Sequence, residues 1–207
     1  MKRTVVTIPM DETVEHARTL MARHGIRHLP VVEGKKLVGI ITDRDVRCTM
    51  VPQPGTGRGR RQVYVLPPDV LVEEAMTAEP VFVTPATDIE EAARLLVARR
   101  IGCLPVVDGG RVVGIITETD ILLVFMEILG VLESSSRIDV ALGRGTKDLE
   151  RATAAIHGAG GKIISVGMSP GRKGAPRVHH FRLKSCDTKP VAAALRKEGF
   201  RILGRMG

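Results

Sequence analysis

The chain has 207 residues, of which 43% are hydrophobic and 26% charged, and this fits one or two globular domains and excludes a disordered chain. Aromatic residues make up only 2% and Trp is absent, which argues against a sugar-stacking or base-stacking surface. The formal net charge is +8, and residues 134–207 alone hold 15 Lys and Arg against 5 Asp and Glu, an asymmetry that favours two modules with different roles.

The first predicted unit lies within residues 1–50 and has the order β-α-β-β-α. A short strand over 4–8 precedes a helix whose apolar residues recur three and four positions apart from Val14 onward. Two β-branched runs separated by a polar turn at 33–36 predict a hairpin that ends at Thr42. A second, shorter helix begins near Asp43.

Residues 51–71 separate this unit from the next. They contain the run Pro-Gln-Pro-Gly-Thr-Gly-Arg-Gly-Arg-Arg, which interrupts helix and strand alike. The composition predicts an exposed linker.

A second unit over 72–126 repeats the first at a constant shift of 75 residues. The shift aligns 29–32 with 104–107, both Leu-Pro-Val-Val, and 38–42 with 113–117, both Val-Gly-Ile-Ile-Thr. It also predicts a strand over 80–84 as the counterpart of the N-terminal one. A unit of about 45 residues buries too little surface to be stable alone. We therefore expect the two copies to pack about a pseudo-twofold axis as one domain.

Each unit ends in Gly-Ile-Ile-Thr-x-x-Asp, with Thr42 and Asp45 in the first copy and Thr117 and Asp120 in the second. If a strand stops at the threonine and a helix starts beyond it, the hydroxyl and the carboxylate project to the same side of the helix N-terminus. A carboxylate there can accept hydrogen bonds from two ribose hydroxyls, and the helix N–H groups can receive a phosphate. The alternative is a capping box that only closes its own helix.

These motifs, together with Val-Glu-Glu-Ala-Met-Thr-Ala-Glu-Pro-Val at 72–81, resemble paired cystathionine β-synthase (CBS) domains, known as a Bateman module. The resemblance covers most of residues 1–125. It implies a regulatory module, not an enzyme, that binds AMP, ADP, ATP or S-adenosylmethionine in the clefts between the two repeats.

The resemblance also implies roles for individual residues. By position, Asp45 and Asp120 would hold ribose hydroxyls, and Thr42 and Thr117 would support ribose or phosphate. The strands ahead of the first helix of each copy would line the adenine with backbone groups, at Thr7 and Ile8 and at Val83 and Thr84.

The two copies differ in their cations. The first has Arg27 and His28 just before Leu-Pro, where the second has Gly102 and Cys103. The resemblance makes Arg27 and His28 candidates to bind a ligand phosphate. Arg44 is a further phosphate candidate, and its counterpart Thr119 is uncharged. Arg27 and His28 could equally be solvated ends of a strand. Our hypothesis is one strong and one weak nucleotide site.

Residues 127–136 connect the second unit to the C-terminal third. The stretch 121–132 is apolar nearly all round, which suggests a helix buried between modules or between subunits. With about twelve residues it is too short to cross a bilayer, which needs about twenty. The N-terminus lacks the apolar segment of a secretory signal, so we expect a cytoplasmic protein without membrane association.

Residues 137–207 predict the order βαββαβ, the ferredoxin-like split βαβ topology. After a CBS pair this resembles an ACT domain, and the whole chain resembles bacterial acetoin-utilisation-type CBS/ACT proteins. The resemblance implies amino-acid sensing and a homodimer. The usual acidic-x-Pro-Gly turn is replaced by Gly-Arg-Gly-Thr at 143–146, which puts amino-acid binding in doubt. The predicted fold class is therefore α+β, a CBS pair followed by an ACT-like domain.

Catalysis and metal binding find little support in the sequence. Nucleophile-elbow, P-loop and His-Glu-x-x-His motifs are absent, and the three cysteines Cys48, Cys103 and Cys186 are widely spaced. The competing function is a basic adaptor that binds an acidic partner or nucleic acid through the C-terminal domain. Nucleic acid is disfavoured because the strand 177–184 has one aromatic residue where base stacking would need two or three.

Overall fold

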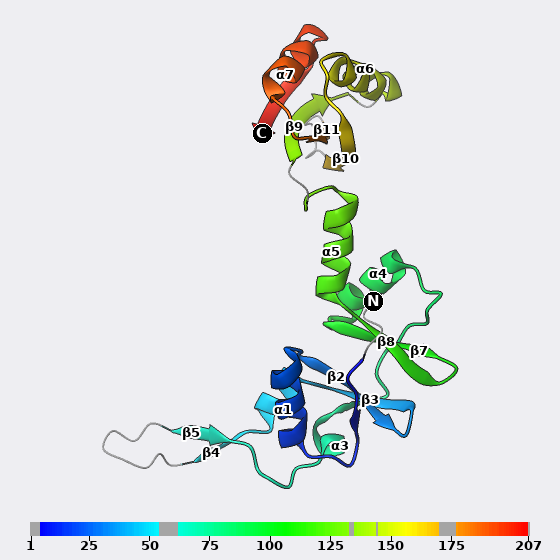
Figure 1. Cartoon of the computed structure of the whole chain (residues 1–207), viewed down its shortest axis with the longest axis vertical. Helices are drawn as coiled ribbons and strands as arrows, with labels where there is room; N and C mark the ends of the chain where they lie inside the picture. Colours follow the sequence, from blue (N-terminus) through cyan, green and yellow to red (C-terminus); the bar gives the residue numbers. More distant parts are fainter. Residues whose placement is uncertain (1–4, 54–61, 133–134, 144, 170–176, 207) are drawn as a thin grey trace. The chain divides into compact units, whose positions relative to one another are not determined.

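The computed structural model describes residues 5–53, 62–132, 135–143, 145–169 and 177–206. The chain divides into two compact units, Met1–Ile121 and Leu122–Gly207. Both units combine helices with β-sheet, so the fold is of the mixed α+β kind (Figure 1).

The first repeat of unit 1 is built around a hairpin and two helices. Its elements are β1 (Ile8–Pro9), α1 (Val14–His24), β2 (His28–Glu33), β3 (Lys36–Thr42) and α2 (Asp43–Cys48). Helix α1 starts where the Thr13 side chain accepts a hydrogen bond from the His16 N–H, and it ends at Gly25, whose φ of 61° is left-handed. The apolar face of α1 packs with Ile8, Leu29 and Ile41 in one buried cluster.

The second repeat has the same helix–hairpin–helix order, preceded by a short helix and a short strand. Its elements are α3 (Val72–Ala75), β6 (Thr77–Ala78), α4 (Ile89–Arg99), β7 (Cys103–Asp108), β8 (Arg111–Thr117) and α5 (Glu118–Ile128). Both hairpins belong to one sheet with the order β1-β2-β3-β8-β7, and β6 pairs with β3 off this path. Residues of the second repeat therefore lie beside the hairpin of the first.

The strands ahead of the first helices are shorter than predicted. Over 4–8 the described strand begins only at Ile8, and over 80–84 the pairing is reduced to one parallel bridge between Val83 and Val106. Pro80 and Pro85 flank this bridge, and proline has no N–H to extend a ladder.

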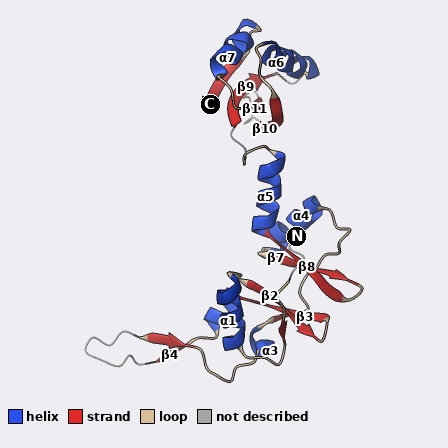
Figure 2. Ribbon diagram, in the orientation of Figure 1, coloured by secondary structure: helices blue, strands red, loops and turns tan. Residues whose placement is uncertain are grey.

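The predicted linker contains regular structure at both ends. Strands β4 (Val51–Gln53) and β5 (Val63–Val65) pair antiparallel and project as a ribbon from the rest of unit 1 (Figure 2). The β-branched residues at 51, 63 and 65 favour strand strongly enough to override the neighbouring prolines and glycines. The run 54–61 lies outside the described residues.

Unit 2 has the element order βαββαβ after the end of α5. Its elements are β9 (Ser135–Leu142), α6 (Thr146–Gly158), β10 (Ile163–Ser169), β11 (Arg177–Lys184), α7 (Thr188–Lys197) and β12 (Arg201–Met206). The sheet order is β10-β11-β9-β12, with every neighbouring pair antiparallel. Helices α6 and α7 cover one face of this sheet, and Ile138, Phe181 and Leu195 are fully buried between the layers.

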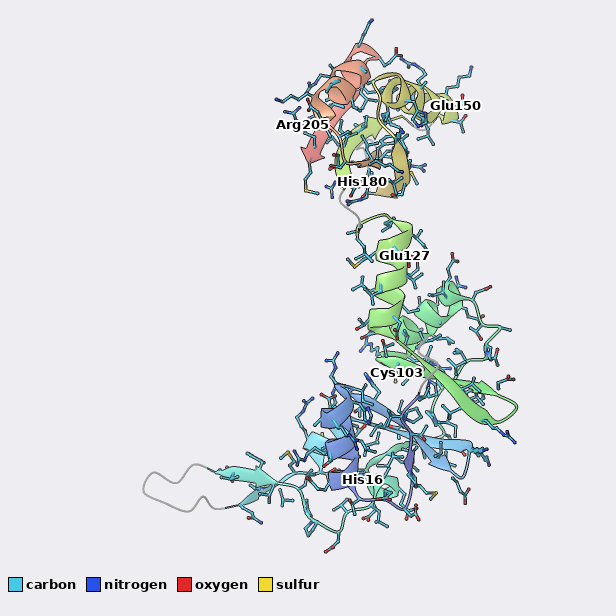
Figure 3. All side chains as sticks on the ribbon, viewed as in Figure 1. His16, Cys103, Glu127, Glu150, His180 and Arg205 are labelled. Atoms are coloured by element: carbon cyan, nitrogen blue, oxygen red, sulfur yellow. The ribbon has the colours of Figure 1, made fainter. Side chains whose placement is uncertain are left out.

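The opposite face of this sheet carries a polar network across three strands. His180 Nδ1 lies 2.7 Å from Asp139 Oδ1, and His180 Nε2 lies 2.7 Å from Ser169 Oγ (Figure 3). Arg137 donates to the other carboxylate oxygen of Asp139 over 2.8 Å. Burial alone would raise the pKa of Asp139, but the hydrogen bonds from Arg137 and His180 outweigh it and hold that pKa below its usual range.

The apolar stretch 121–132 is helical only to Ile128. Ile121 is 8% exposed, whereas Leu122 and Ile128 are 58% and 61% exposed. Within the described ranges, no helix is both long and apolar enough to cross a bilayer.

Candidate functional site

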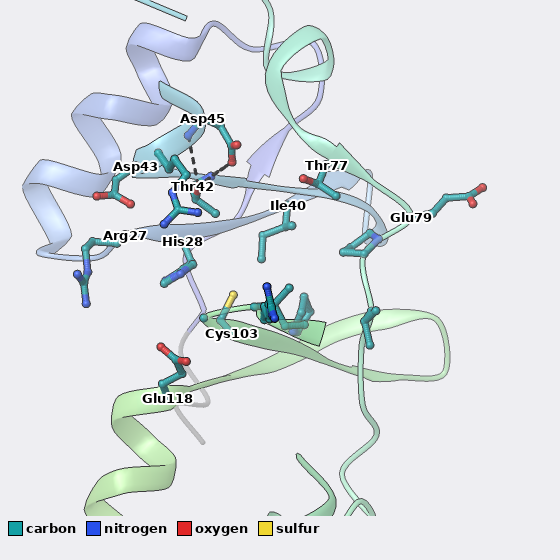
Figure 4. A pocket seen from close by; sticks show the side chains of 17 residues that line it. Arg27, His28, Ile40, Thr42, Asp43, Asp45, Thr77, Glu79, Cys103 and Glu118 are labelled. Atoms are coloured by element: carbon teal, nitrogen blue, oxygen red, sulfur yellow. Dashed lines mark hydrogen bonds between the residues drawn. The ribbon is translucent and has the colours of Figure 1, made fainter. Parts of the chain in front are cut away.

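A cleft of about 610 Å³ lies between the β2–β3 hairpin of the first repeat and the β7–β8 hairpin of the second (Figure 4). Its walls come from three segments: 27–45 of the first repeat, 77–81 around β6, and 100–118 of the second repeat. The volume suits a small organic ligand, since such sites commonly measure about 300–1,000 Å³.

The first wall is organised by a reciprocal cap at the start of α2. Asp45 Oδ2 accepts hydrogen bonds from the Thr42 N–H at 2.8 Å and from the Thr42 hydroxyl at 2.7 Å. Thr42 Oγ1 in turn accepts from the Asp45 N–H at 3.3 Å. This is the capping box that was the alternative to a ribose-binding role for the motif. It fixes the carboxylate at the edge of the cleft.

The capping box does not use the whole carboxylate. Among the described residues, no hydrogen bond to Asp45 Oδ1 is seen. An ionised carboxylate oxygen accepts two hydrogen bonds. Asp45 can therefore close its helix with one oxygen and bind a ligand hydroxyl with the other.

The second wall lies close to the first at Gly102. A Cβ at this position would lie 3.0 Å from His28 Nε2 and 3.9 Å from Glu118 Oε2. The absence of a side chain thus leaves His28 room to lie against the second repeat. In Figure 4 the Glu118 carboxylate points toward this meeting point from the start of α5.

Burial shifts the pKa values of two titratable groups in the cleft. Burial and the nearby Arg27 charge lower the pKa of His28, against the opposing pull of Asp43, Glu118 and Asp45. Because this pKa lies below its usual value of about 6.5, His28 is mainly neutral at pH 7. Burial raises the pKa of the Cys103 thiol to about 12, so this thiol is not a nucleophile.

Three arginines are among the residues that line the cleft, Arg27, Arg44 and Arg100. In the described part of the chain none of the three forms an ion pair or a side-chain hydrogen bond. Elsewhere in unit 1, Arg18 pairs with Glu15, and Arg47 lies 3.0 Å from Asp43. Four acidic residues, Asp43, Asp45, Glu79 and Glu118, line the same cleft, so its lining carries both signs of charge.

Two backbone positions at the cleft are strained. In the described ranges, Glu79 and Arg100 are the non-glycine residues with positive φ, at 48° and 54°. Both line the cleft. Such conformations cost about 1–3 kcal/mol each and cluster at functional sites.

The structure separates the predicted site residues into two groups. Arg27, His28, Thr42, Arg44 and Asp45 come together in the cleft. The remaining predicted residues do not line it: Thr7, Ile8, Val83, Thr84, Thr117 and Asp120.

Most residues of this second group are buried in the core or hydrogen-bonded elsewhere in unit 1. Ile8 is fully buried in the core, and Val83 exchanges backbone hydrogen bonds with Pro105 and Val107 of β7. Thr117 and Asp120 form the same capping box as Thr42 and Asp45, with Thr117 Oγ1 donating to Asp120 Oδ2 over 2.7 Å.

Sequence reasoning missed the contributions of the segment 77–81, of Arg100 and of Glu118. Arg100 had a signal, because the repeat shift places it on Gly25, the helix-ending glycine of the first copy. Glu118 likewise matches Asp43. No sequence signal pointed to residues 77–81, because their place beside β3 depends on how the repeats pack. No group of three His, Cys, Asp or Glu side chains suited to a metal ion occurs in the described segments.

Comparison with known proteins assigns the repeats. A family model described as CBS domain matches residues 1–51 and 72–127, more than half of the chain. Inosine-5'-monophosphate dehydrogenase of Korarchaeum cryptofilum is 32% identical over 151 residues, which cover 72% of this chain and 28% of the dehydrogenase. The chain spans only 28–30% of the length of the first three curated relatives it matches.

Two solved structures are similar to more than half of the chain. The CBS domain pair of protein MJ0100, in complex with 5'-methylthioadenosine and S-adenosyl-L-methionine, matches with a TM-score of 0.50 at 27% identity, covering 61% of this chain and 92% of that one. A Vibrio cholerae protein, AcuB, described as an acetoin utilization protein, matches with a TM-score of 0.51 at 30% identity, covering 63% and 90%.

Proposed function

The chain belongs to the CBS-domain family, and we propose that its two repeats form a regulatory module that binds an adenosine-containing ligand in the cleft between their hairpins. The observation that carries this proposal is Asp45: its carboxylate is held by Thr42 at the edge of a 610 Å³ cleft with one oxygen left for a ligand. The ligands in the MJ0100 complex, which contain adenosine, support the ligand class.

In this proposal the ribose lies against α2. Asp45 Oδ1 accepts hydrogen bonds from the ribose hydroxyls, and Thr42 keeps the carboxylate oriented. Ile40 and Pro105 supply apolar surface on the two walls for the base. The ligand touches both repeats, so its binding energy favours one relative arrangement of the two hairpins over others. A regulatory role is consistent with this coupling between the ligand and the arrangement of the repeats.

The test compares two capping boxes that differ only in their surroundings. Asp45→Ala and Asp120→Ala each remove one box, at a cost of about 1 kcal/mol in stability. Only Asp45 lines the cleft. Isothermal titration with AMP, ADP, ATP and S-adenosylmethionine should show at least a tenfold weaker affinity for Asp45→Ala, because a hydrogen bond to a charged group contributes about 1.5–3 kcal/mol. The affinity of Asp120→Ala for the same cleft should match that of the wild type.

Two outcomes contradict the proposal. If the wild-type chain binds none of these ligands, the proposed function of the cleft is wrong. Equal losses of affinity in both variants would mean that the effect comes from helix capping alone.

For unit 2 we propose an ACT-like domain that supports dimerisation or amino-acid sensing. Its βαββαβ order and its helices on one sheet face favour this topology. The exposed Leu122 and Ile128 give a homodimer apolar surface to bury. Light scattering should report twice the chain mass of 22.4 kDa, and a monomer at micromolar concentration would contradict the dimer.

The charge of residues 134–207 favours one alternative, a basic adaptor for an acidic partner. Binding through such a surface weakens steeply with salt. Ligand stabilisation that persists from low to high ionic strength supports the nucleotide module, and binding that disappears with salt supports the adaptor.

A further inference from the structure

Three side chains on the open face of the unit 2 sheet form a chain of hydrogen bonds from a serine through a histidine to an aspartate. Ser169 Oγ lies 2.7 Å from His180 Nε2, and His180 Nδ1 lies 2.7 Å from Asp139 Oδ1. The three residues come from β10, β11 and β9, so no local sequence motif contains them all. The same order of groups activates a nucleophilic serine on several unrelated folds, where it is recognised by geometry.

The charge of Asp139 decides which ring nitrogen of His180 carries the proton. Although burial opposes it, the hydrogen bonds from Arg137 and His180 hold the pKa of Asp139 below its usual range. The carboxylate is therefore ionised at neutral pH and can only accept, so His180 donates through its Nδ1–H. In the neutral ring Nε2 then has a free lone pair, and the Ser169 hydroxyl donates to it. This is the arrangement in which a histidine acts as a general base toward a serine.

Exposure to solvent increases along the chain of hydrogen bonds from the acid to the base. The side chain of Asp139 is 12% exposed and that of His180 is 32% exposed. Ser169 is also partly exposed. Arg137 donates to the second oxygen of Asp139 over 2.8 Å, so both oxygens are held and the imidazole is fixed in orientation. The aspartate is thus shielded, whereas the histidine and the serine are open to a molecule from solution.

Two glycines shape the surface around this network. A Cβ at Gly204 would lie 2.8 Å from Asp139 Oδ2 and would push the carboxylate out of its position. Gly167 pairs with His180 and lies two residues before Ser169, so it belongs to the same face. Within the described residues, a Cβ at Gly167 would meet no atom outside its chain neighbours closer than 4.0 Å. The surface above Gly167 is therefore open beside both reactive side chains.

We propose that Ser169 is a nucleophilic serine that accepts the acyl group of a small ester, with His180 as its general base and Asp139 as a positioning residue. The acyl group lies in the open space above Gly167. The inference concerns unit 2 alone and is independent of the ligand proposed for unit 1.

The proposed reaction is a transfer between oxygens without any change of oxidation state. Ser169 Oγ attacks the ester carbonyl carbon while its proton passes to His180 Nε2. The ester C–O bond then breaks, and His180 returns the proton to the departing alcohol. Water, activated by the same nitrogen, releases the acid and restores the serine. Strand β10 is an edge of its sheet, and the outward N–H groups of an edge strand are donors for the oxygen on which charge develops.

The first experiment treats the full-length chain with a fluorophosphonate probe, which phosphonylates activated serines and releases fluoride. Peptide mass spectrometry should locate the adduct on Ser169, and Ser169→Ala should abolish it. The matched control is Ser165→Ala on the same strand and the same face. The Ser165 hydroxyl donates to the Leu129 carbonyl over 2.7 Å instead of to a base, so its removal should leave the labelling rate unchanged.

His180 and Asp139 are tested by the rate of the same labelling. His180→Ala should be labelled at least about a hundredfold more slowly, because a positioned general base contributes about 10²–10⁴-fold. Imidazole added to the solution should restore part of this rate, which a purely structural role of His180 would not allow. Asp139→Asn should also slow labelling, since its amide can donate to Nδ1 and place the ring proton on Nε2. Melting temperatures show whether each variant is folded.

A further variant keeps all three side chains of the network. Gly167→Val fills the proposed acyl space with a residue that favours strand. The wild type should release nitrophenol from p-nitrophenyl acetate faster than Ser169→Ala does, and Gly167→Val should lose most of this difference.

Either of two results overturns the inference. In the first, Ser169 of the folded wild type is labelled no faster than Ser165. In the second, a folded His180→Ala is labelled at the wild-type rate. Both would leave the nucleotide site of unit 1 untouched, because titration with adenosine ligands tests residues of the other unit.

Discussion

His28 shows at the scale of one residue how the cleft couples packing to charge. Gly102 leaves space for its ring, and the same close packing removes water from the imidazole. Burial is the main cause of its lowered pKa, and Arg27 adds to it. The first repeat thus keeps a neutral donor and acceptor beside its cations, a combination suited to a phosphate or a hydroxyl.

The lowered pKa of His28 makes acid destabilise unit 1. In the unfolded chain the imidazole has a pKa of about 6.5. Below that pH the unfolded state binds a proton more readily than the folded state does. The contribution of His28 to stability is therefore complete above the unfolded pKa and is lost as the pH falls toward the folded one. Urea unfolding measures the free energy of unfolding at pH 7.5 and at pH 5.0. The decrease between the two pH values should be smaller for His28→Asn than for the wild type.

The comparison between these two proteins is what isolates His28. His179 and Asp139 also have lowered pKa values and also destabilise the chain in acid, but they do so equally in both proteins. Identical losses in the wild type and in His28→Asn would show that the imidazole is not held neutral by the fold.

At the scale of elements, the cleft depends on how β6 lies against β3. The pairing joins Gly39 to Ala78 and Ile40 to Thr77, and it places residues 77–81 along the cleft. Met76 covers Gly39 so closely that a Cβ there would overlap its sulfur. The glycine of the Val-Gly-Ile-Ile-Thr motif therefore serves packing between β3 and the segment 76–78, a role that the motif alone does not reveal.

Gly39→Ala should destabilise unit 1 by about 1–3 kcal/mol, because an added methyl group overpacks this contact. The free energy of unfolding from urea titrations measures the loss. In a Met76→Ala background the same substitution should cost much less, since the space is then open. An undiminished cost in that background would contradict the contact with Met76.

At the scale of the whole molecule, the chain holds two units with separate cores. The cluster around Ile8, Leu29 and Ile41 belongs to unit 1, and the cluster around Ile138, Phe181 and Leu195 belongs to unit 2. The proposed ligand touches only unit 1. Ligand binding and the stability of unit 2 are therefore expected to be separable.

Calorimetry should resolve two unfolding transitions. ADP should raise the midpoint temperature of only one of them. At a free ligand concentration of 100 times Kd the stabilisation is about 2.7 kcal/mol. Ile138→Val should lower the other transition, since deleting one buried methyl group costs about 0.5–1.5 kcal/mol. A single transition that responds to both ADP and Ile138→Val would mean that the two units unfold together.

The sequence by itself determined the duplication, the helices and hairpins of each repeat and the Thr-x-x-Asp caps, because these follow from local periodicity and from residues three positions apart. It singled out Arg27, His28, Thr42, Arg44 and Asp45 through the Thr-x-x-Asp motif, the family resemblance and the cations near that motif, and the structure brings these five into one cleft. Only the tertiary structure decided that the Thr42–Asp45 capping box borders this cleft, and that Glu118, Arg100 and the segment 77–81 complete it. Those residues come from different elements, and their meeting is set by the packing of one hairpin against another, which no local pattern encodes.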